Sequence, residues 1–430
     1  MTDLWNAPVA PGPIRGTVQI PGSKSIANRA LILASLATGP ATIDNVPQRG
    51  RDIQLMIAGL RSLGTELVIT GNRVAVTPRP FQGPAAIDCG LAGTVMRFLP
   101  PAAGLARGAI RFDGDEQARA RPMDTLLNAL HDIGLQVATE GSPSLPFTVD
   151  ATGVIPGGAV TLDASRSSQF VSALLLSGAR FEQGLHLIHR GSALPSVPHI
   201  EMTCALLAEH GVHVAANAID RSHASWQIAA GELQPVNRTI EPDLSNATPF
   251  MAAAMLTGGE VLIADWPSHS VQPAAQLLAV LHQMGATTTA TSAGMLVSGT
   301  GSINGITADL GDIGELVPTL TAICALADTP STLTGIGHIA GHETNRLVAL
   351  ATEVNRLGGH VRADDDGLTI TPRPLHSGIW ETYADHRMAT AGAIIGLMVP
   401  GVQVRDIATT AKTFQEFPRV WQSLISDSAR

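Results

Sequence analysis

Apolar and polar residues follow a repeating order along the chain: an apolar helical stretch, a glycine that ends it, and a short alternating strand. Five copies of this order can be recognised, with glycines at Gly64, Gly134, Gly211, Gly285 and Gly358. Glycine suits such helix ends because it enters the left-handed backbone region without a Cβ clash. The pattern predicts a strand after each glycine, at 66–70, 135–138, 212–215, 286–291 and 360–363.

The five glycines are evenly spaced, at intervals of 70, 77, 74 and 73 residues. This period divides the 430 residues about six times, so the spacing predicts six α+β units. The sixth marker falls near Leu424, where no strand follows, and a strand expected around 14–20 is a candidate to fill that vacancy. Unrelated helices that happen to end in Leu-Gly are the alternative explanation, which the even spacing disfavours.

The number of units also predicts the domain organisation. Six units exceed what one hydrophobic core comfortably holds, so we expect an α/β protein with two domains of three α+β repeats each. One domain would comprise residues 22–237 and the other residues 1–21 with 241–430, so that both termini belong to the same domain. The chain would cross from one domain to the other near 21–22 and near 237–241.

Composition narrows the class of protein. The net charge of −9 gives no general attraction for nucleic acid or an anionic membrane, so a basic site must be a local cluster, which suits a small anionic substrate. The three cysteines lack the paired spacing of a disulfide framework or a thiolate zinc site. Neither a signal-peptide pattern nor a run of about 18 apolar residues occurs, so we expect a cytoplasmic protein without membrane contact.

Two of the 27 basic residues are lysines, Lys24 and Lys412. A chain that otherwise uses arginine and keeps lysine at two positions suggests sites that need a compact, mobile charge. Chance survival of two surface lysines is the alternative. The motifs around both residues favour an anion site.

The segment 21–31 predicts a helix whose first turns are basic. Pro21-Gly22 would end a strand and Ser23 could cap the Ala/Leu-rich helix that follows. Lys24, Ser25 and Arg29 would then lie at its start, where free N–H groups and the helix dipole favour a phosphate or carboxylate. An ordinary capped helix explains the same letters, and the spacing of a Walker A loop is missing.

Further segments combine small residues, hydroxyls, acids and cations in a similar way. They are 91–97, 113–122, 165–170, 309–315, 341–346, 383–388 and 410–414. Each alone is equally well explained as a solvated loop with helix caps. His338 and His342 have the spacing of zinc ligands on a helix, but Gly337 and Gly341 disfavour a helix there and no third ligand is evident, so no metal site is expected.

Taken in order, PGSKSIANRAL at 21–31, DHRMA at 385–389 and AKTF at 411–414 resemble the family of 5-enolpyruvylshikimate-3-phosphate (EPSP) synthases. The resemblance runs from about residue 14 to residue 414 and is strongest to actinobacterial members. It implies two domains, each of three βαβαββ-type units, that close on their substrates. It also implies transfer of the carboxyvinyl group of phosphoenolpyruvate to the 5-hydroxyl of shikimate 3-phosphate, with release of phosphate and without a metal or organic cofactor. We expect the protein to be a monomer.

The resemblance also implies which residues bind the two substrates. Shikimate 3-phosphate would contact Lys24, Ser25, Arg29, Ser167, Ser168, Gln169, Ser196, Glu315 and His342. Phosphoenolpyruvate would contact Lys24, Gly93, Arg121, Gln169, Arg346, Arg387 and Lys412. These sets are physically sensible because two phosphates and two carboxylates need charge-assisted hydrogen bonds from guanidinium and ammonium groups.

The resemblance assigns catalysis to Glu315 as general base, Glu343 as proton donor and Lys24 beside them. Several positions depart from the more usual family pattern: Leu91 and His338 replace asparagine, Glu315 and Asn345 replace aspartate, and His342 replaces lysine. The longer side chain at Glu315 puts its role as base in doubt. A cationic His342 would make substrate binding weaken above neutral pH.

Two other functions remain open on sequence grounds. UDP-N-acetylglucosamine 1-carboxyvinyltransferases are a sister family, but their usual loop cysteine would fall at Glu116. A repeat-built binding protein without catalytic activity would show substrate binding without turnover.

Overall fold

The computed structural model describes residues 3–428 of the chain. The chain divides into two compact units. We call Gly22–Ile240 the N-terminal unit, and the segments up to Pro21 and from Glu241 onward the C-terminal unit. Each is described by itself.

The N-terminal unit contains three four-stranded sheets of one design, in which the first pair of strands is parallel and the other pairs are antiparallel. The first sheet has the order β14 (Arg238–Thr239), β3 (Ala41–Asp44), β5 (Arg73–Thr77), β4 (Glu66–Thr70). The second has the order β6 (Ala85–Asp88), β7 (Arg107–Asp113), β9 (Phe147–Thr152), β8 (Gln136–Thr139). The third has the order β10 (Gly158–Leu162), β11 (Leu185–Arg190), β13 (His223–Ile228), β12 (Val214–Asp220).

The C-terminal unit repeats this design. Its first sheet has the order β2 (Arg15–Val18), β15 (Glu260–Ala264), β17 (Gly294–Ser298), β16 (Thr287–Thr291). Its second has the order β18 (Thr307–Asp309), β19 (Ser331–Thr334), β21 (Leu368–Thr371), β20 (His360–Ala363). The third has three strands in the described residues, in the order β22 (Gly378–Trp380), β23 (Val402–Arg405), β1 (Leu4–Asn6).

The predicted repeat is therefore confirmed, with one sheet for each of its six units. The five marker glycines have φ values of 79° to 105°, and each follows the end of a helix. Strands β4 and β20 occupy the predicted ranges, and β8, β12 and β16 begin one or two residues after the predicted start. Left-handed glycines thus join these five helices to the strands that follow them.

The interpretation of the N-terminal strand was wrong in one respect. Strand β2 lies within the expected range, but it pairs with β15 in the first sheet of the C-terminal unit. The shorter β1 fills the vacancy in the sixth repeat, where Leu4 to Asn6 pair antiparallel with β23. Three residues are too few for alternation of polar and apolar side chains to reveal the strand.

The helices are of two kinds. Six have nearly all their residues buried: α1 (Lys24–Leu36), α3 (Gly93–Ala103), α6 (Gln169–Gly178), α8 (Leu244–Thr257), α10 (Val317–Ala325) and α12 (His386–Met398). Six others bury one face: α2 (Arg51–Ser62), α5 (Asp124–Asp132), α7 (Val197–Glu209), α9 (Ala274–Gln283), α11 (Arg346–Arg356) and α13 (Phe417–Asp427). Short turns of helix are α4 (Glu116–Arg119), η1 (Gly314–Leu316), η2 (Gly337–Gly341) and η3 (Ile407–Lys412).

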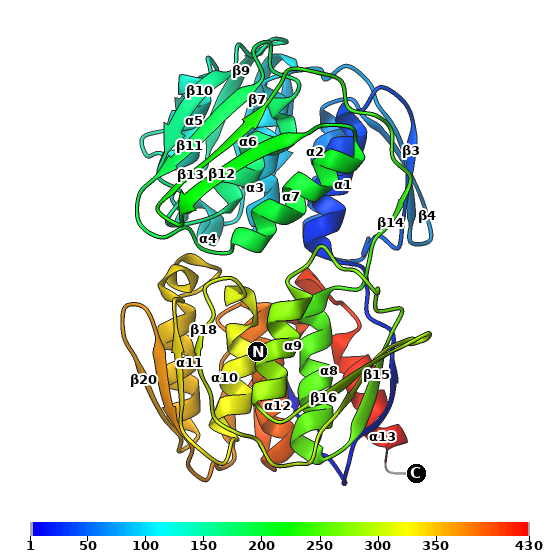
Figure 1. Ribbon diagram of the computed structural model, residues 1–430, viewed down its shortest axis with the longest axis vertical. Helices are drawn as coiled ribbons and strands as arrows, with labels where there is room; N and C mark the ends of the chain where they lie inside the picture. The colour runs from blue at the N-terminus through cyan, green and yellow to red at the C-terminus, as the bar shows by residue number, and fades with distance from the viewer. Residues whose placement is uncertain (1–2, 429–430) are drawn as a thin grey trace. The chain divides into compact units, whose positions relative to one another are not determined.

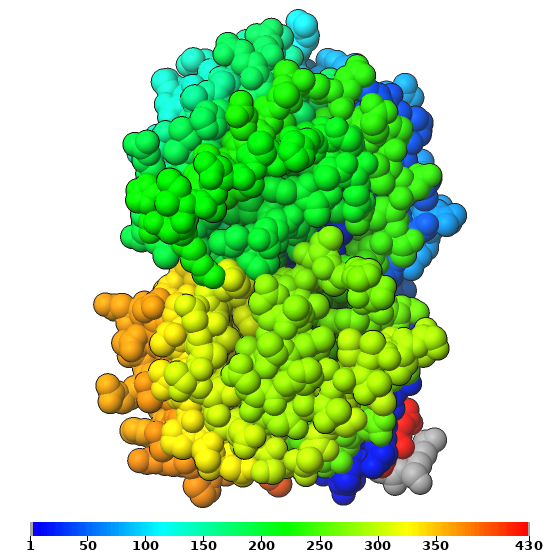
Figure 2. All heavy atoms as spheres, in the orientation of Figure 1, coloured from blue at the N-terminus to red at the C-terminus, as the bar shows by residue number. Residues whose placement is uncertain are grey.

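The first kind of helix forms the centre of each unit. In Figure 1, α1, α3 and α6 of the N-terminal unit lie among its strands, and α12 of the C-terminal unit runs behind α9 and α10. In the space-filling view, residues of α9 and α10 lie in front of α12, which agrees with the burial of His386 to Leu397 (Figure 2). Among the described residues, no helix is both long and apolar enough to span a membrane.

Candidate active site

Four helices of the N-terminal unit begin at residues that the sequence singled out. Lys24, Gly93 and Gln169 are the first residues of α1, α3 and α6, and Ser196 precedes α7 with a left-handed φ of 52°. Helix N-termini carry free N–H groups and the positive end of the helix dipole. Convergence of such ends favours bound anions.

Hydrogen bonds join these helix starts. The amide of Asn28 on α1 donates to Thr94 Oγ1 on α3 at 2.6 Å. Arg97 of α3 donates through Nη1 to Gln169 Oε1 at 2.8 Å and to Ser167 Oγ at 3.3 Å. These contacts hold the starts of α1, α3 and α6 together.

Gly93 lies against two predicted ligands. A Cβ atom built at this glycine would lie 3.1 Å from Arg121 Nη1 and 3.3 Å from Gln169 Oε1. Arg121 is itself largely buried. The structure therefore brings Gly93, Arg121 and Gln169 together, with no room for a larger side chain unless the two polar groups shift.

Lys24 has an acidic partner that the sequence analysis missed. Its Nζ lies 2.9 Å from Asp52 Oδ2, and Asp52 is almost fully buried in the first turn of α2. The two residues are 28 positions apart, and a single aspartate at a helix start usually serves the helix dipole, so no local signal distinguished it. The pair fixes the ammonium group at the start of α1.

Arg29 is a buried cation whose hydrogen bonds go to neutral groups. It is 1% exposed, and it donates to Thr203 Oγ1, to Ser172 Oγ and to the backbone carbonyls of Ser25 and His199. Burial lowers its pKa to about 9. None of these hydrogen-bond partners carries a negative charge, so the buried positive charge of Arg29 is not balanced by them.

Several of the serines that the sequence singled out in this unit lie at helix starts. Ser168 is the N-cap residue of α6 and is buried, but its side chain makes no capping hydrogen bond. The expectation that Ser23 caps α1 was wrong: Ser23 is the N-cap residue, yet its side chain accepts no hydrogen bond from the helix. Its buried hydroxyl has no hydrogen-bond partner among residues 3–428.

The C-terminal unit gathers acidic and basic side chains at the starts of α11 and α12. Arg346 makes a fork to Asp385, with Nε to Oδ2 at 2.8 Å and Nη2 to Oδ1 at 3.1 Å. The same guanidinium donates to Glu343 Oε2 at 2.6 Å, and Lys412 Nζ pairs with the other oxygen of Glu343. Burial disfavours the charged Arg346, but Asp385 and Glu343 outweigh it and raise its pKa above the usual value.

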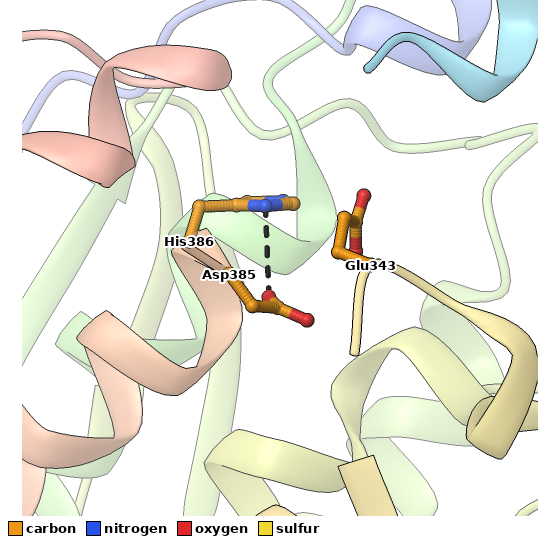
Figure 3. Close-up of side chains that lie close together, drawn as sticks. All are labelled: Glu343, Asp385 and His386. Atoms are coloured by element: carbon orange, nitrogen blue, oxygen red, sulfur yellow. Dashed lines mark ion pairs between the residues drawn. The ribbon is translucent and has the colours of Figure 1, made fainter. Parts of the chain in front are cut away.

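Glu343, Asp385 and His386 lie close enough for one metal ion to reach all three (Figure 3). Both carboxylates, however, already pair with cations: Glu343 with Arg346 and Lys412, and Asp385 with Arg346. A divalent ion would have to displace these contacts and would face two positive charges. The cluster is therefore better suited to proton transfer beside cations than to metal binding.

Arg387 lies in the first turn of α12 and faces the start of α8. It donates to Ser245 Oγ and, at 3.4 Å, to Asn246 Oδ1, which also accepts from Thr413, the neighbour of Lys412. Burial lowers the pKa of Arg387, and the negative charge of Asp243, whose Oδ1 lies 4.0 Å from Nη2, only partly offsets this. Arg387 thus resembles Arg29, a buried cation with mainly neutral partners.

Glu315 lies on η1, close to a second histidine. A Cβ atom at the preceding Gly314 would lie 2.4 Å from His338 Nε2, so this glycine lets the ring approach. Burial lowers the pKa of His338, and the negative charge of Glu315 only partly offsets this. The side chain of His338 is therefore neutral beside the predicted base.

The buried His338 should make the free energy of unfolding depend on pH. Its folded-state pKa lies below the ordinary 6.5, so the unfolded chain binds this proton more readily and stability is lost as the pH falls below about 6.5. We expect His338→Asn to lose less unfolding free energy than the wild type between pH 7 and pH 5.5, by at most ~1.4 kcal/mol per pH unit. Urea denaturation at both pH values measures this, and equal losses for the two proteins would contradict it.

The structure alters the interpretation of His342. Arg346 Nη1 donates to His342 Nδ1 at 2.9 Å, and since a guanidinium can only donate, Nδ1 must lack a hydrogen. A protonated ring would break this bond, so the expected cationic His342 is disfavoured, and the hydrogen of the neutral ring is on Nε2. The rings of His338 and His342 meet edge-on with centroids 5.8 Å apart; His338 lies on the 3-10 turn η2 and His342 directly follows it, so the two are not on an α-helix.

The predicted residues thus form two groups, one within each unit. The N-terminal group offers lysine, arginines, hydroxyls and an amide, and the C-terminal group adds two carboxylates next to cations. The residues that sequence reasoning did not select as ligands, and that hold these groups in place, are Asp52, Arg97, Asp385, Ser245 and Asn246.

Comparisons with known proteins agree with this chemistry. The family model described as EPSP synthase (3-phosphoshikimate 1-carboxyvinyltransferase) matches residues 9–421. A 3-phosphoshikimate 1-carboxyvinyltransferase from Kocuria rhizophila is 50% identical, with 98% of this chain and 97% of the relative covered. An EPSP synthase structure from Acinetobacter baumannii has a TM-score of 0.80 at 22% identity, covering 98% and 97% of the two chains. The enolpyruvyl transferase NikO from Streptomyces tendae has a TM-score of 0.75 at 19% identity, covering 97% and 96%. The predicted two-domain enolpyruvyl transferase fold is therefore confirmed.

Proposed function

This chain belongs to the EPSP synthase family, and from that premise we propose how its two groups of residues serve the reaction. The enzyme transfers the carboxyvinyl group of phosphoenolpyruvate to the 5-hydroxyl of shikimate 3-phosphate and releases phosphate. Both substrates carry a phosphate and a carboxylate. The observation that carries the residue assignment is the presence of two buried cations, Arg29 and Arg387, whose hydrogen bonds go to neutral groups, in a chain whose net charge is −9.

Shikimate 3-phosphate is the proposed ligand of Arg29, Ser25, Ser196 and the serines that begin α6. The carboxylate or phosphate of this substrate would supply the negative charge that Arg29 lacks. His342 is a further proposed ligand of this substrate, as a neutral ring. Support for this assignment is the position of these groups at helix starts, where N–H groups also face the ligand.

Phosphoenolpyruvate is the proposed ligand of the remaining cations. In the N-terminal unit these are Lys24 and Arg121, with Gly93 and Gln169 beside them. In the C-terminal unit they are Arg346, Arg387 and Lys412. Arginine forks and mobile ammonium groups together neutralise a small trianion better than either kind alone.

Two carboxylates would move the protons. Glu315 would accept the proton of the 5-hydroxyl as its oxygen attacks, and Glu343 would deliver a proton to the methylene carbon of phosphoenolpyruvate. Glu343 would then take a proton back when the tetrahedral intermediate expels phosphate. Its contacts with Lys412 and Arg346 support this role, because the cations stabilise the carboxylate between the two transfers.

Gly93→Ala is expected to separate substrate from inhibitor binding. The new methyl group would lie 3.1 to 3.3 Å from Arg121 and Gln169, so both must shift by a few tenths of an ångström. Glyphosate, the inhibitor of the family, is longer than phosphoenolpyruvate and should lose more affinity. We expect the inhibition constant for glyphosate to rise at least about tenfold more than the KM for phosphoenolpyruvate, which corresponds to ~1.4 kcal/mol of selective crowding. Steady-state inhibition measures both, and equal increases would rule the idea out.

The choice of acceptor tests the proposed function. Purified protein is given phosphoenolpyruvate with shikimate 3-phosphate or with UDP-N-acetylglucosamine, and released phosphate is followed over time. We expect release with shikimate 3-phosphate alone. Release with the nucleotide sugar would assign the chain to the sister chemistry, and substrate binding without release would indicate a non-catalytic protein. The cytoplasmic location and the monomeric state stay predictions.

A further inference from the structure

A buried histidine of the N-terminal unit, His189, has no part in the chemistry above. It lies on β11 with no exposed surface, and both ring nitrogens contact backbone groups. The N–H of Ala164 donates to Nδ1 at 3.1 Å, and Nε2 lies 3.1 Å from the carbonyl oxygen of Ser192. Because Nδ1 accepts, the hydrogen must be on Nε2, which donates to Ser192. The ring is held in one neutral tautomer.

The two backbone groups belong to two different loops. Residues 163–168 connect β10 to α6 and carry Ser167 and Ser168, and residues 191–196 connect β11 to α7 and carry Ser196. Ala164 also accepts the N–H of Ser167 at 2.9 Å, so its peptide sets the turn on which that serine lies. His189 therefore contacts both loops that present hydroxyls at the starts of α6 and α7.

A second contact supports the same arrangement. The hydroxyl of Ser165 contacts both Asp163 and, at 2.9 Å, the carbonyl of Ser192, so its one hydrogen is shared between these oxygens and the Ser192 carbonyl is contacted from the first loop as well as by His189. Asp163 fixes Ser165 in turn, by accepting its N–H at 2.9 Å. The two loops are thus joined through one carbonyl oxygen and one imidazole ring.

We propose that His189 is a positioning residue that fixes Ser167, Ser168 and Ser196 relative to one another for shikimate 3-phosphate. This inference rests on the proposed function of those serines. Short hydroxyls on loops bind a ligand well only when the loops are already ordered, because disorder must otherwise be removed on binding. Loss of His189 should therefore weaken binding of shikimate 3-phosphate and leave phosphoenolpyruvate, whose proposed ligands lie on other elements, much less affected.

Three substitutions of His189 test its two hydrogen bonds separately. His189→Asn places an acceptor near the position of Nδ1 and keeps the bond to Ala164, whereas His189→Gln can reach Ser192 with its amide and loses the bond to Ala164. His189→Leu keeps neither. We expect the KM for shikimate 3-phosphate to rise about tenfold or more in the leucine variant, and less in the other two, with kcat and the KM for phosphoenolpyruvate changed less than about threefold.

His210→Leu is the matched control. His210 is also buried in this unit. It lies at the C-terminal end of α7, away from Ser196 at the start of that helix, and its ring contacts the carbonyl of Gln234. We expect this control to lower Tm and to leave the KM for shikimate 3-phosphate within twofold of the wild type.

The possible results distinguish the proposed role of His189 from the proposed function of the protein. A selective rise for shikimate 3-phosphate in the leucine variant, partly rescued by asparagine or glutamine, supports the inference. If the leucine variant does not fold, a selective rise in the other two supports it. An unchanged KM in all folded variants, or equal rises for both substrates, would overturn it while the proposed function stands. A wild-type protein that does not use shikimate 3-phosphate would overturn both.

Discussion

Replacing Glu343 by glutamine should lower kcat by about 10²- to 10⁴-fold, the usual contribution of a positioned acid or base. Glutamine keeps the shape of the side chain but can neither deliver nor accept the proton. It also removes a negative charge that pairs with Arg346 at 2.6 Å and with Lys412. These cations then have one anionic partner fewer, so the KM for phosphoenolpyruvate should stay constant or fall. Steady-state kinetics with each substrate varied measures both effects.

The control for this change is Glu381→Gln in the same unit. Glu381 pairs with Arg405 at 2.9 Å and lies outside the proposed ligands. We expect its kcat to stay within twofold of the wild type. A Glu343→Gln variant with more than a third of the wild-type kcat would exclude Glu343 as the proton donor.

Replacing Arg29 by methionine should raise the Kd for shikimate 3-phosphate by about 10²- to 10³-fold. Removing one partner of a buried charge pair costs ~3–4 kcal/mol, because the other charge is left uncompensated. The ligand-free variant should be at least as stable as the wild type, since Arg29 is buried without a carboxylate partner. After the change the hydroxyl of Thr203 still donates to the carbonyl of His199 at 2.9 Å and still lies 3.0 Å from Ser172 Oγ, so no new unpaired hydroxyl results.

Calorimetric titration and urea unfolding of the same preparation test both parts of this prediction. Arg73→Met is the control, because Arg73 is an exposed arginine of the same unit that pairs with Asp44. Its Kd should equal that of the wild type. A Kd for Arg29→Met within threefold of the wild type would exclude Arg29 as a substrate ligand, and a large loss of unfolding free energy would show that the guanidinium serves the fold.

The helices, strands and repeat could be predicted because each depends on local signals. A left-handed glycine lets the chain turn from a helix end into a strand, and it does so at Gly64 and Gly358 with φ of 103° and 94°. The exchange of β1 and β2 between two repeats could not be predicted. Strand pairing is settled by tertiary contacts, and a strand of three residues carries too little pattern.

The same division holds for the residues of the site. The helix starts at Lys24, Gly93 and Gln169 could be predicted as anion-binding positions, because capping residues and small residues in the nearby sequence indicate where a helix begins. Their partners were not, because Asp52 and Arg97 reach them only through packing of separate helices. His342 shows most clearly what the sequence could not predict. Because it replaces a lysine we expected a cation, but the hydrogen bond from Arg346 makes the neutral ring the favoured form.

Phosphorus NMR of the wild-type protein with phosphoenolpyruvate and shikimate 3-phosphate, without added metal, tests the central claim most directly. We predict that the phosphoenolpyruvate signal disappears and that inorganic phosphate appears in equal amount. The phosphate of shikimate 3-phosphate should be retained in one new compound, also in equal amount. Persistence of both substrate signals, or release of phosphate from shikimate 3-phosphate itself, would contradict the account.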